Sequence, residues 1–260
     1  MAEQPAGEPW ALRLFRKSVL KQRKLREIQG LLGPTEGLRC LDLGSDNGVV
    51  SLLLRRAGGS WDSADLTAEA VASIRELVGE RVELVDGARL PWPDAAFDRV
   101  VVVDMLEHVA GEAAFAAELA RVTRPGGLLL VNTPHLKRTL LRRLRHALGQ
   151  TDEKHGHLRP GYTPDRLREL FEPGLRLEAA HTYSRFFSEL VDTFINWGVE
   201  RLGKRGSAKG LVVTGGDLQK NRKAFRAYAL VYPVVAAVAA LDALVPASGY
   251  MLIARLRRPA

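Results

Sequence analysis

The segment Arg39-Cys40-Leu41-Asp42-Leu43-Gly44-Ser45-Asp46-Asn47-Gly48-Val49-Val50 combines three local patterns. Its apolar beginning predicts a short buried strand, its middle a tight turn, and its end the first residues of a helix. Gly44 and Gly48 allow the backbone to turn sharply and a ligand to approach closely. Because ligands of open α/β sheets bind beyond the carboxyl ends of the strands, this turn is a candidate cofactor site.

Strands and helices alternate on the C-terminal side of this turn. Apolar runs predict strands, counting the one in the opening segment, at 38–43, 60–65, 82–85, 97–103 and 128–132. Helical spacing of apolar residues predicts helices at 49–56, 68–78 and 112–122. This βαβ order predicts an α/β fold with a parallel, doubly wound sheet.

The pattern changes after residue 134. Leucines spaced by four among arginines predict a basic amphipathic helix at 136–148. Thr163 and Pro164 predict the N-cap and first position of a helix within 162–171. Two further strands, 175–183 and 250–256, are separated by about sixty residues, more than a hairpin connection needs. We expect this interval to contain a helix at 186–202, a glycine-rich loop at 203–216 and an apolar helix around 227–244.

The chain is therefore expected to have four parts. Residues 1–36 contain a basic helix at 10–32, residues 37–184 form the α/β core, residues 185–248 form a helical and partly apolar insertion, and residues 249–260 form the closing strand and a basic tail. The first nine residues are polar, so we expect no signal peptide. Cys40 is the only cysteine, which excludes an internal disulfide framework and a cysteine metal cluster.

Charge is distributed unevenly along the chain, whose formal net charge is +8. Residues 37–135 hold 9 Lys/Arg against 15 Asp/Glu, whereas residues 136–260 hold 22 against 11. Basic flanks around an acidic core indicate an anionic partner surface, such as lipid headgroups or nucleic acid. The alternative is a solvated, arginine-rich surface without a partner.

Three acidic residues follow predicted strands at the same edge as the glycine turn. Asp65 ends the second strand, twenty-one residues beyond Gly44, where a carboxylate can accept both ribose hydroxyls of a nucleoside. Asp86 follows the third strand, where it can accept an adenine amino hydrogen. Asp104 follows the fourth. Because parallel strands end at one edge, the fold is expected to gather all three beside the turn.

With these residues in place, the sequence resembles the class I S-adenosylmethionine-dependent methyltransferases, in the branch with ubiquinone-biosynthesis-type and other small-molecule enzymes. The resemblance covers residues 38–171 and the closing strand; the matching segments are 41–44 with Gly48, 64–66, 86–91, 97–98, 106–109 and 119–131. It implies a seven-stranded Rossmann-like sheet of order 3-2-1-4-5-7-6 with strand 7 antiparallel. It also implies S-adenosylmethionine as the cofactor.

The resemblance further implies which residues bind this cofactor. Asp42, Gly44 and Gly48 would border its methionine part, Asp65 with Leu66 its ribose, Asp86 with Gly87 its adenine, and Asp104 its methionine or sulfonium end. The family usually has a small residue where this chain has Asp46, so the turn is expected to follow an altered path or to point Asp46 into solvent. An extra carboxylate here also disfavours a dinucleotide, whose pyrophosphate it would repel.

Methyl transfer to a hydroxyl benefits from a general base, and histidine suits this role near neutral pH. His108 matches the Glu-His pair that the family carries after strand four, and His135 follows the fifth strand. His155 and His157 lie in a loop that could cover the pocket. A structural role is the alternative for each histidine. We assign no metal site, because the spacing of these residues matches no metal signature.

We therefore expect a methyltransferase with a small-molecule, lipid or lipid-linked glycan acceptor. The basic helices and the apolar segment predict a cytoplasmic protein that lies peripherally on the anionic inner face of the membrane. The longest uncharged run, 227–241, has 15 residues, fewer than the roughly 20 of a spanning helix. The alternative for the insertion is a lid or a dimer contact in a soluble enzyme, and the sequence does not indicate an oligomeric state.

Two other functions remain open. An RNA methyltransferase would suit the basic flanks, but the chain has no Asn/Asp-Pro-Pro-aromatic motif after strand four, so we expect no nucleic-acid partner. A non-catalytic scaffold that keeps the fold would be consistent with Asp46.

Overall fold

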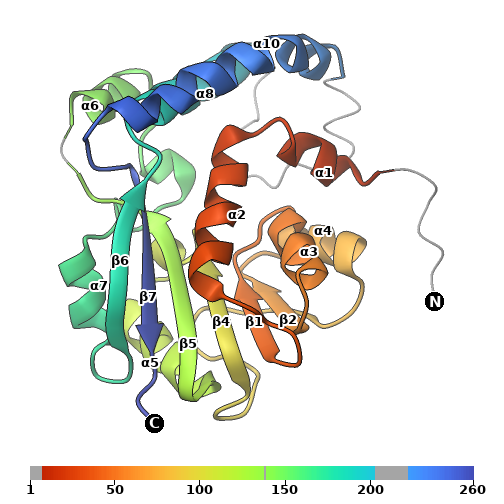
Figure 1. The fold of residues 1–260 in the computed structure, drawn as a ribbon, viewed down its shortest axis with the longest axis vertical. Helices are drawn as coiled ribbons and strands as arrows, with labels where there is room; N and C mark the ends of the chain where they lie inside the picture. Colours follow the sequence, from red (N-terminus) through yellow and green to blue (C-terminus); the bar gives the residue numbers. More distant parts are fainter. Residues whose placement is uncertain (1–7, 138, 203–221) are drawn as a thin grey trace.

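The computed structural model describes residues 8–137, 139–202 and 222–260 (Figure 1). One seven-stranded sheet of order β3-β2-β1-β4-β5-β7-β6 forms its centre, and β7 runs antiparallel to both of its neighbours. The strands are β1 (Arg39–Leu43), β2 (Ser60–Asp65), β3 (Val82–Leu84), β4 (Phe97–Val103), β5 (Thr123–Pro134), β6 (Arg176–Tyr183) and β7 (Met251–Arg257). This topology confirms the expected fold. The glycine-rich loop predicted at 203–216 lies outside the described residues.

Alternate side chains of the strands divide the core into two halves. Leu41 of β1 belongs to the half that packs against α5 (Glu112–Val122) and α7 (Pro164–Phe171). Its neighbour Cys40 belongs to the other half, with α2 (Val19–Leu32) and α3 (Val49–Arg56). The bounds of α3, α5 and α4 (Ala68–Val78) agree with the sequence prediction, as does the N-cap of α7, where the Thr163 side chain accepts from the Arg166 N–H.

The N-terminal helix differs from the expected single helix at 10–32. It is broken into α1 (Trp10–Phe15) and α2, because the Ser18 hydroxyl oxygen accepts a hydrogen bond from the backbone N–H of Lys21. A serine that caps the following turn competes with continuous helix, and this restarts the chain in a new direction. The break lets α2 cross the sheet beside β5 and β7.

The basic helix predicted at 136–148 is shorter than expected. Helix α6 (Leu140–Ala147) begins only after Thr139, whose side chain accepts from the Arg142 N–H. The backbone N–H of Leu136 donates to the Tyr162 carbonyl, which holds the preceding residues extended. The leucine stripe also faces outward, since Leu136, Leu140 and Leu144 are exposed and Leu141 is the buried leucine of α6.

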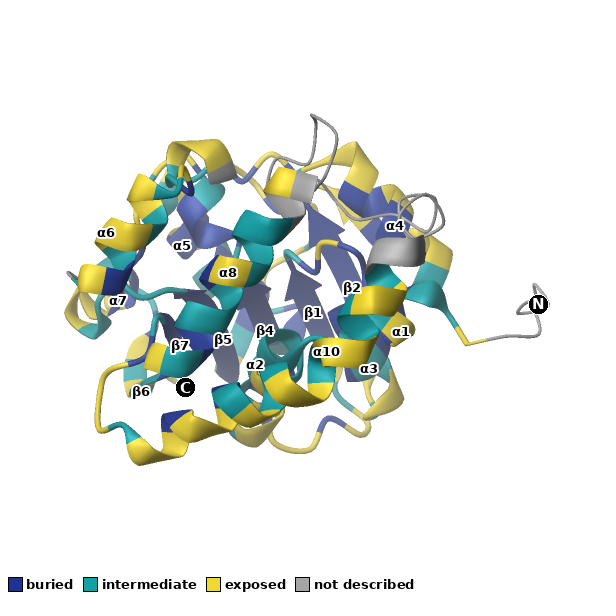
Figure 2. Cartoon of the chain, turned by 90° about the horizontal axis from the view of Figure 1, so that it is seen from above, coloured by how far each residue is buried: buried dark blue, intermediate teal, exposed yellow. Residues whose placement is uncertain are grey.

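A helical layer lies across the carboxyl ends of the parallel strands (Figures 1 and 2). It contains α6, α8 (Phe186–Leu202), α10 (Arg222–Ala240) and the short helix η3 (Leu241–Leu244). All but α6 come from the chain between β6 and β7, which confirms a helical insertion there. Buried Asp242 ties the two ends of the insertion together. The Asp242 carboxylate accepts hydrogen bonds from the backbone N–H groups of Arg185, Phe187 and Ser188.

Candidate active site

The turn after β1 fits tightly against the end of β4. Gly44 has φ +83°, and a Cβ there would lie 2.2 Å from the Val103 carbonyl oxygen. Gly48 has φ +77°, and a Cβ there would lie 2.8 Å from the Ile74 Cα. At both positions, only glycine tolerates the positive φ together with the close approach of the neighbouring backbone. The turn is thereby placed at the carboxyl edge of the sheet, as the sequence predicted.

Asp46 lies in the turn, and both its backbone N–H and its carboxylate have partners. Its φ of +57° lies in the left-handed region, which explains why a glycine suits this position. Its backbone N–H donates to Asp65 Oδ2 over 3.3 Å, and its carboxylate lies 3.5 Å from the Lys21 ammonium of α2. Lys21, which lies outside the motif, therefore places a positive charge beside the additional carboxylate.

Asp42, which we expected to border the methionine part of the cofactor, holds elements of the fold together. Its side chain is fully buried behind the turn. The Ser63 hydroxyl donates to it over 2.6 Å, the Ser51 hydroxyl over 2.5 Å, and the Arg55 guanidinium lies 3.3 Å away. These partners from α3 and β2 use both carboxylate oxygens, so Asp42 holds β1, β2 and α3 together.

Asp65 stands at the end of β2 and is held from two sides. Its Oδ1 accepts from the Leu66 N–H over 2.7 Å, and its Oδ2 accepts from the turn. Burial raises the pKa of Asp65 to about 6. A carboxylate that is fixed by backbone donors keeps further lone pairs for two hydroxyl donors, which is the geometry that ribose requires.

A pocket of about 530 Å³ adjoins Asp65. Its lining residues are Leu66, Leu84, Val85, Asp86, Arg89, Leu90 and Pro91. Hydrogen bonds from the Ala88 and Arg89 N–H groups hold the pKa of the exposed Asp86 low and its carboxylate in place. Apolar walls beside a fixed acceptor suit adenine, so these residues fit the adenosine half of S-adenosylmethionine.

Asp104 lies in a hydrogen-bonded network at the end of β4. Its φ is +46°, and its Oδ1 accepts from the Asn132 side-chain amide over 2.6 Å. Asn132 in turn accepts from the Tyr183 hydroxyl over 2.5 Å. The other oxygen of Asp104 pairs with the Lys24 ammonium of α2. The sequence did not point to Lys24, because nothing in a basic helix indicates which lysine faces the core.

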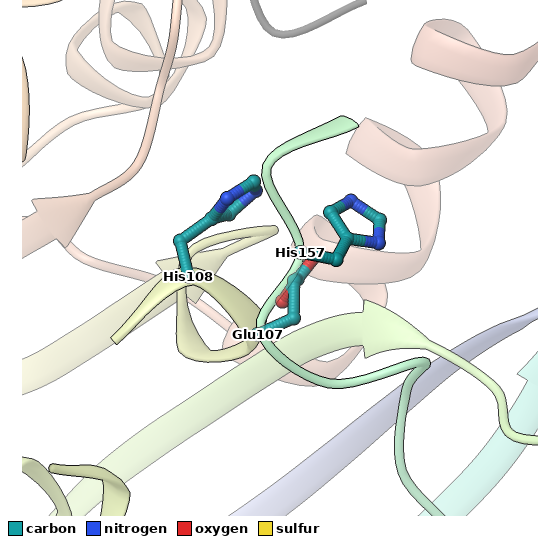
Figure 3. Close-up of side chains that lie close together, drawn as sticks. All are labelled: Glu107, His108 and His157. Atoms are coloured by element: carbon teal, nitrogen blue, oxygen red, sulfur yellow. The ribbon is translucent and has the colours of Figure 1, made fainter. Parts of the chain in front are cut away.

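Glu107, His108 and His157 meet at the same edge (Figure 3). The first two belong to the short helix η1 (Leu106–His108), and His157 follows η2 (Glu153–His155). The imidazole rings meet edge to face, with centroids 4.9 Å apart. His108 Nδ1 lies 3.0 Å from the Gly156 carbonyl oxygen. Because a carbonyl only accepts, this nitrogen carries a proton, and in the neutral ring Nε2 keeps its lone pair.

Glu107 is a buried carboxyl group beneath these rings. The Thr133 hydroxyl donates to its Oε2 over 3.1 Å, and its Oε1 has no hydrogen-bond partner among the described residues. Burial and the nearby Asp104 carboxylate raise the pKa of Glu107 to about 8, so it is protonated at neutral pH.

The same three side chains could also hold a divalent cation, because a potential ligand atom from each lies within 4.8 Å of the others. We assigned no metal site from the sequence. His157 lies forty-nine residues beyond His108, so spacing did not indicate this cluster.

The other candidate histidines are placed differently. His135 follows β5, its Nδ1 lies 2.9 Å from the Gly249 carbonyl oxygen, and its backbone N–H donates to the Tyr250 carbonyl. These contacts tie it to the beginning of β7. The side chain of His155 lies outside the described part of the structure.

Comparison with known proteins shows which segment of the chain is similar to a known domain. Residues 41–131 match the family model described as a methyltransferase domain. A demethylmenaquinone methyltransferase of Mycobacterium bovis is 37% identical over 105 residues, which cover 38% of this chain and 42% of that protein. A ubiquinone biosynthesis O-methyltransferase of Xylella fastidiosa is 35% identical over 114 residues, or 41% and 45% of the two chains. The chain thus matches less than half of the length of these relatives.

Solved structures extend the likeness over most of the chain. An S-adenosylmethionine-dependent methyltransferase from Mesorhizobium loti has a TM-score of 0.55 at 17% identity, covering 91% of this chain and 96% of that one. The [4+2]-cyclase SpnF has a TM-score of 0.63 at 18% identity, covering 92% and 82%. Identities this low show the fold alone. The segment 41–131, which includes the glycine turn and Asp65, is therefore similar to a methyltransferase domain, and the chain as a whole has the fold of these solved structures.

Proposed function

We propose that the chain transfers a methyl group from S-adenosylmethionine to a hydroxyl group of a small, lipid-soluble acceptor. The names of the two relatives, a demethylmenaquinone and a ubiquinone-biosynthesis methyltransferase, support this acceptor class. The observation that carries the proposal is the position of His108, whose Nδ1 is held by the Gly156 carbonyl at the edge that also holds the adenosine pocket. Methylation of a hydroxyl releases its proton, and a positioned histidine can accept that proton near neutral pH.

The cofactor supplies a methyl group already activated by its sulfonium, and the protein supplies position and proton transfer. Asp65 would bind the ribose hydroxyls, and the pocket beside Asp86 would receive the adenine. His108 Nε2 accepts the proton of the acceptor hydroxyl while Nδ1 stays bound to Gly156. Protonated Glu107 beneath the ring adds no negative charge there, and the His157 ring fixes the orientation of His108 from the side.

The test is transfer of a labelled methyl group from S-adenosylmethionine to a demethylated quinol in detergent. His108→Gln is expected to lower kcat by roughly 100- to 10,000-fold and to leave the cofactor Kd unchanged. His135→Gln is the matched control, because this histidine is tied to β7, and it should retain most of the activity. Full activity of the His108→Gln variant would refute the role of the base.

The scaffold alternative makes a different prediction for binding. Calorimetry of the parent protein with S-adenosylmethionine should show a single site, and the Asp65→Ala variant should lose it. If the parent protein bound no cofactor, the chain would be a scaffold and the enzymatic proposal would fail. Binding to RNA with a steep dependence on salt would instead support the nucleic-acid alternative.

A further inference from the structure

Helix α10 and η3 expose an apolar stripe in the helical layer. The exposed fractions are 82% for Leu230, 50% for Val231, 66% for Val234, 40% for Leu241 and 78% for Leu244. Leu230, Val231 and Val234 lie within about one turn of α10, and Leu241 and Leu244, three residues apart, continue the apolar surface in η3. Arg226 is the one charged residue among the described side chains of α10. A continuous exposed stripe of large aliphatic side chains marks an interaction surface.

The opposite side of α10 is fixed to the protein. The Tyr228 hydroxyl donates to the Lys17 carbonyl oxygen over 2.9 Å, and the Gln22 side-chain amide donates to the Tyr232 hydroxyl over 2.9 Å. The segment Phe225–Leu244 is long and apolar enough to cross a membrane, although only 11% of it is buried inside the protein. Its polar contacts with the N-terminal segment hold it flat against the body. This arrangement suits a helix that lies in the plane of an interface.

Helix α6 presents a second apolar edge of the same layer. Leu140 is 81% exposed, and Leu136 and Leu144 are also exposed. Arg142, Arg143 and Arg145 lie between or beside these leucines, and α6 has no acidic residue. The acidic residues Glu189 and Asp192 of the adjacent α8 pair inward with Lys137 and Arg145. Arg142 pairs with Asp152, and the exposed Arg143 stands beside the outward leucines.

A small pocket between α6 and α8 carries a cationic lining. It has a volume of about 320 Å³ and is lined by Ala147, Leu148, Lys154, Trp197 and Arg201, with no carboxylate among them. The Arg201 guanidinium lies 5.3 Å from the centre of the Trp197 ring. Two cations beside a tryptophan suit a phosphate at the boundary between water and hydrocarbon.

We propose that the face formed by α6, α8, α10 and η3 docks on the surface of a bilayer that contains anionic lipids. The leucine and valine side chains enter the outer acyl region, and the pocket of Lys154 and Arg201 receives a lipid phosphate. The charge of the chain decides between this occupant and a second copy. The two segments that contain this layer, 136–154 and 185–248, hold 15 Lys/Arg against 7 Asp/Glu, a net charge of +8. Two copies joined through this face would therefore repel each other, whereas an anionic bilayer attracts it.

This proposal goes beyond the methyl transfer and stands without it, since vesicle binding needs neither cofactor nor acceptor. If both hold, the acceptor is delivered from the bilayer, because the docking layer lies over the edge of the sheet that carries the cofactor site (Figure 1).

The first test is flotation of the full chain with vesicles of phosphatidylcholine, with or without phosphatidylglycerol. The protein should float with the anionic vesicles. Leu230→Asp with Val234→Asp should lower the bound fraction roughly tenfold or more, because two carboxylates must then enter the acyl boundary. Ala113→Asp with Ala117→Asp adds the same charge to the exposed side of α5 and should bind like the parent. Unfolding temperatures close to that of the parent confirm that the variants fold.

The second test separates the phosphate pocket from general charge. Lys154→Gln with Arg201→Gln should weaken binding to the anionic vesicles and flatten its salt dependence, whereas Arg168→Gln with Arg176→Gln removes two exposed cations elsewhere and should have little effect. Absence of flotation, or equal flotation of the Leu230/Val234 variant, would overturn the proposal. So would a dimer in solution that this variant dissociates without any change in vesicle binding.

Discussion

The Lys21 ammonium lies 3.5 Å from the Asp46 carboxylate and so joins the N-terminal helix α2 to the cofactor turn. Three residues further along the same helix, Lys24 pairs with Asp104 at the end of β4. The N-terminal helix therefore supplies cations to two neighbouring strand ends. The acidic edge of this sheet is balanced by a segment that lies outside the matched domain.

Replacing Asp46 with glycine should leave the fold as stable as the parent or stabilise it by up to about 1 kcal/mol. Glycine relieves the left-handed backbone, and the lost ion pair is half exposed and contributes little. Asp46→Ala, which keeps the unfavourable φ, should instead destabilise by about 1 kcal/mol. Urea unfolding measures both. A loss of stability in the glycine variant would show that the pair with Lys21 outweighs the backbone term.

Cofactor binding should weaken as the pH falls below about 6. The pKa of Asp65 is raised to about 6, and only the ionised carboxylate accepts both ribose hydroxyls, so affinity is lost as the group is protonated. Asp65→Asn should cost roughly ten- to hundredfold in Kd at pH 7.5 and should remove this pH dependence. Calorimetry from pH 5 to 8 provides the measurement. A pH-independent Kd in the parent would argue against the ribose assignment.

Lys24→Met should destabilise the protein by about 1–2 kcal/mol, because it leaves the Asp104 carboxylate without its cation in a partly buried site. Asp104→Asn should recover most of this loss in the Lys24→Met background. A double-mutant cycle by chemical unfolding isolates the coupling. Additive effects of the two substitutions would mean that the pair is not coupled in solution.

Glu107→Gln should stabilise the protein increasingly as the pH rises. The folded-state pKa of Glu107 is about 8, above its ordinary value of 4.5. The folded parent therefore keeps this proton between the two values, and its stability falls as the pH rises through that window. Gln is neutral throughout, so the gain in unfolding temperature should grow from about pH 5 to about pH 8 and level off above it. The exposed Glu172→Gln serves as the control and should follow the parent at every pH.

The βαβ core could be predicted from local sequence because each element carries its own signal. The apolar run of β4, the glycines at 44 and 48 and the N-cap Thr163 act within a few residues of the structure that they specify. The order of the strands came with the family resemblance, since strand pairing between distant segments has no local signal. The sheet confirms that order.

The parts of the structure that differed from the sequence prediction depend on long-range contacts. Leu136 is held extended by Tyr162, which lies twenty-six residues away, so helical periodicity overstated the length of α6. Lys24 and His157 reach the site only through packing of separate segments, and Asp42 is satisfied by serines from two other elements. Periodicity shows that a helix has an apolar face but does not show what covers it, which is why the outward leucines of α6 appeared only in the structure.

The insertion leaves and re-enters the sheet at one point. Tyr183, at the end of β6, pairs with Met251, at the beginning of β7, and the Tyr250 N–H donates to the Ser184 carbonyl. Because both stems of the insertion lie in one antiparallel ladder, β6 and β7 pair through their own backbones. The length and sequence of the insertion can therefore change during evolution, provided that its contacts with the N-terminal segment change with it. The outer surface of the protein can thus diverge while the cofactor edge of the sheet stays the same.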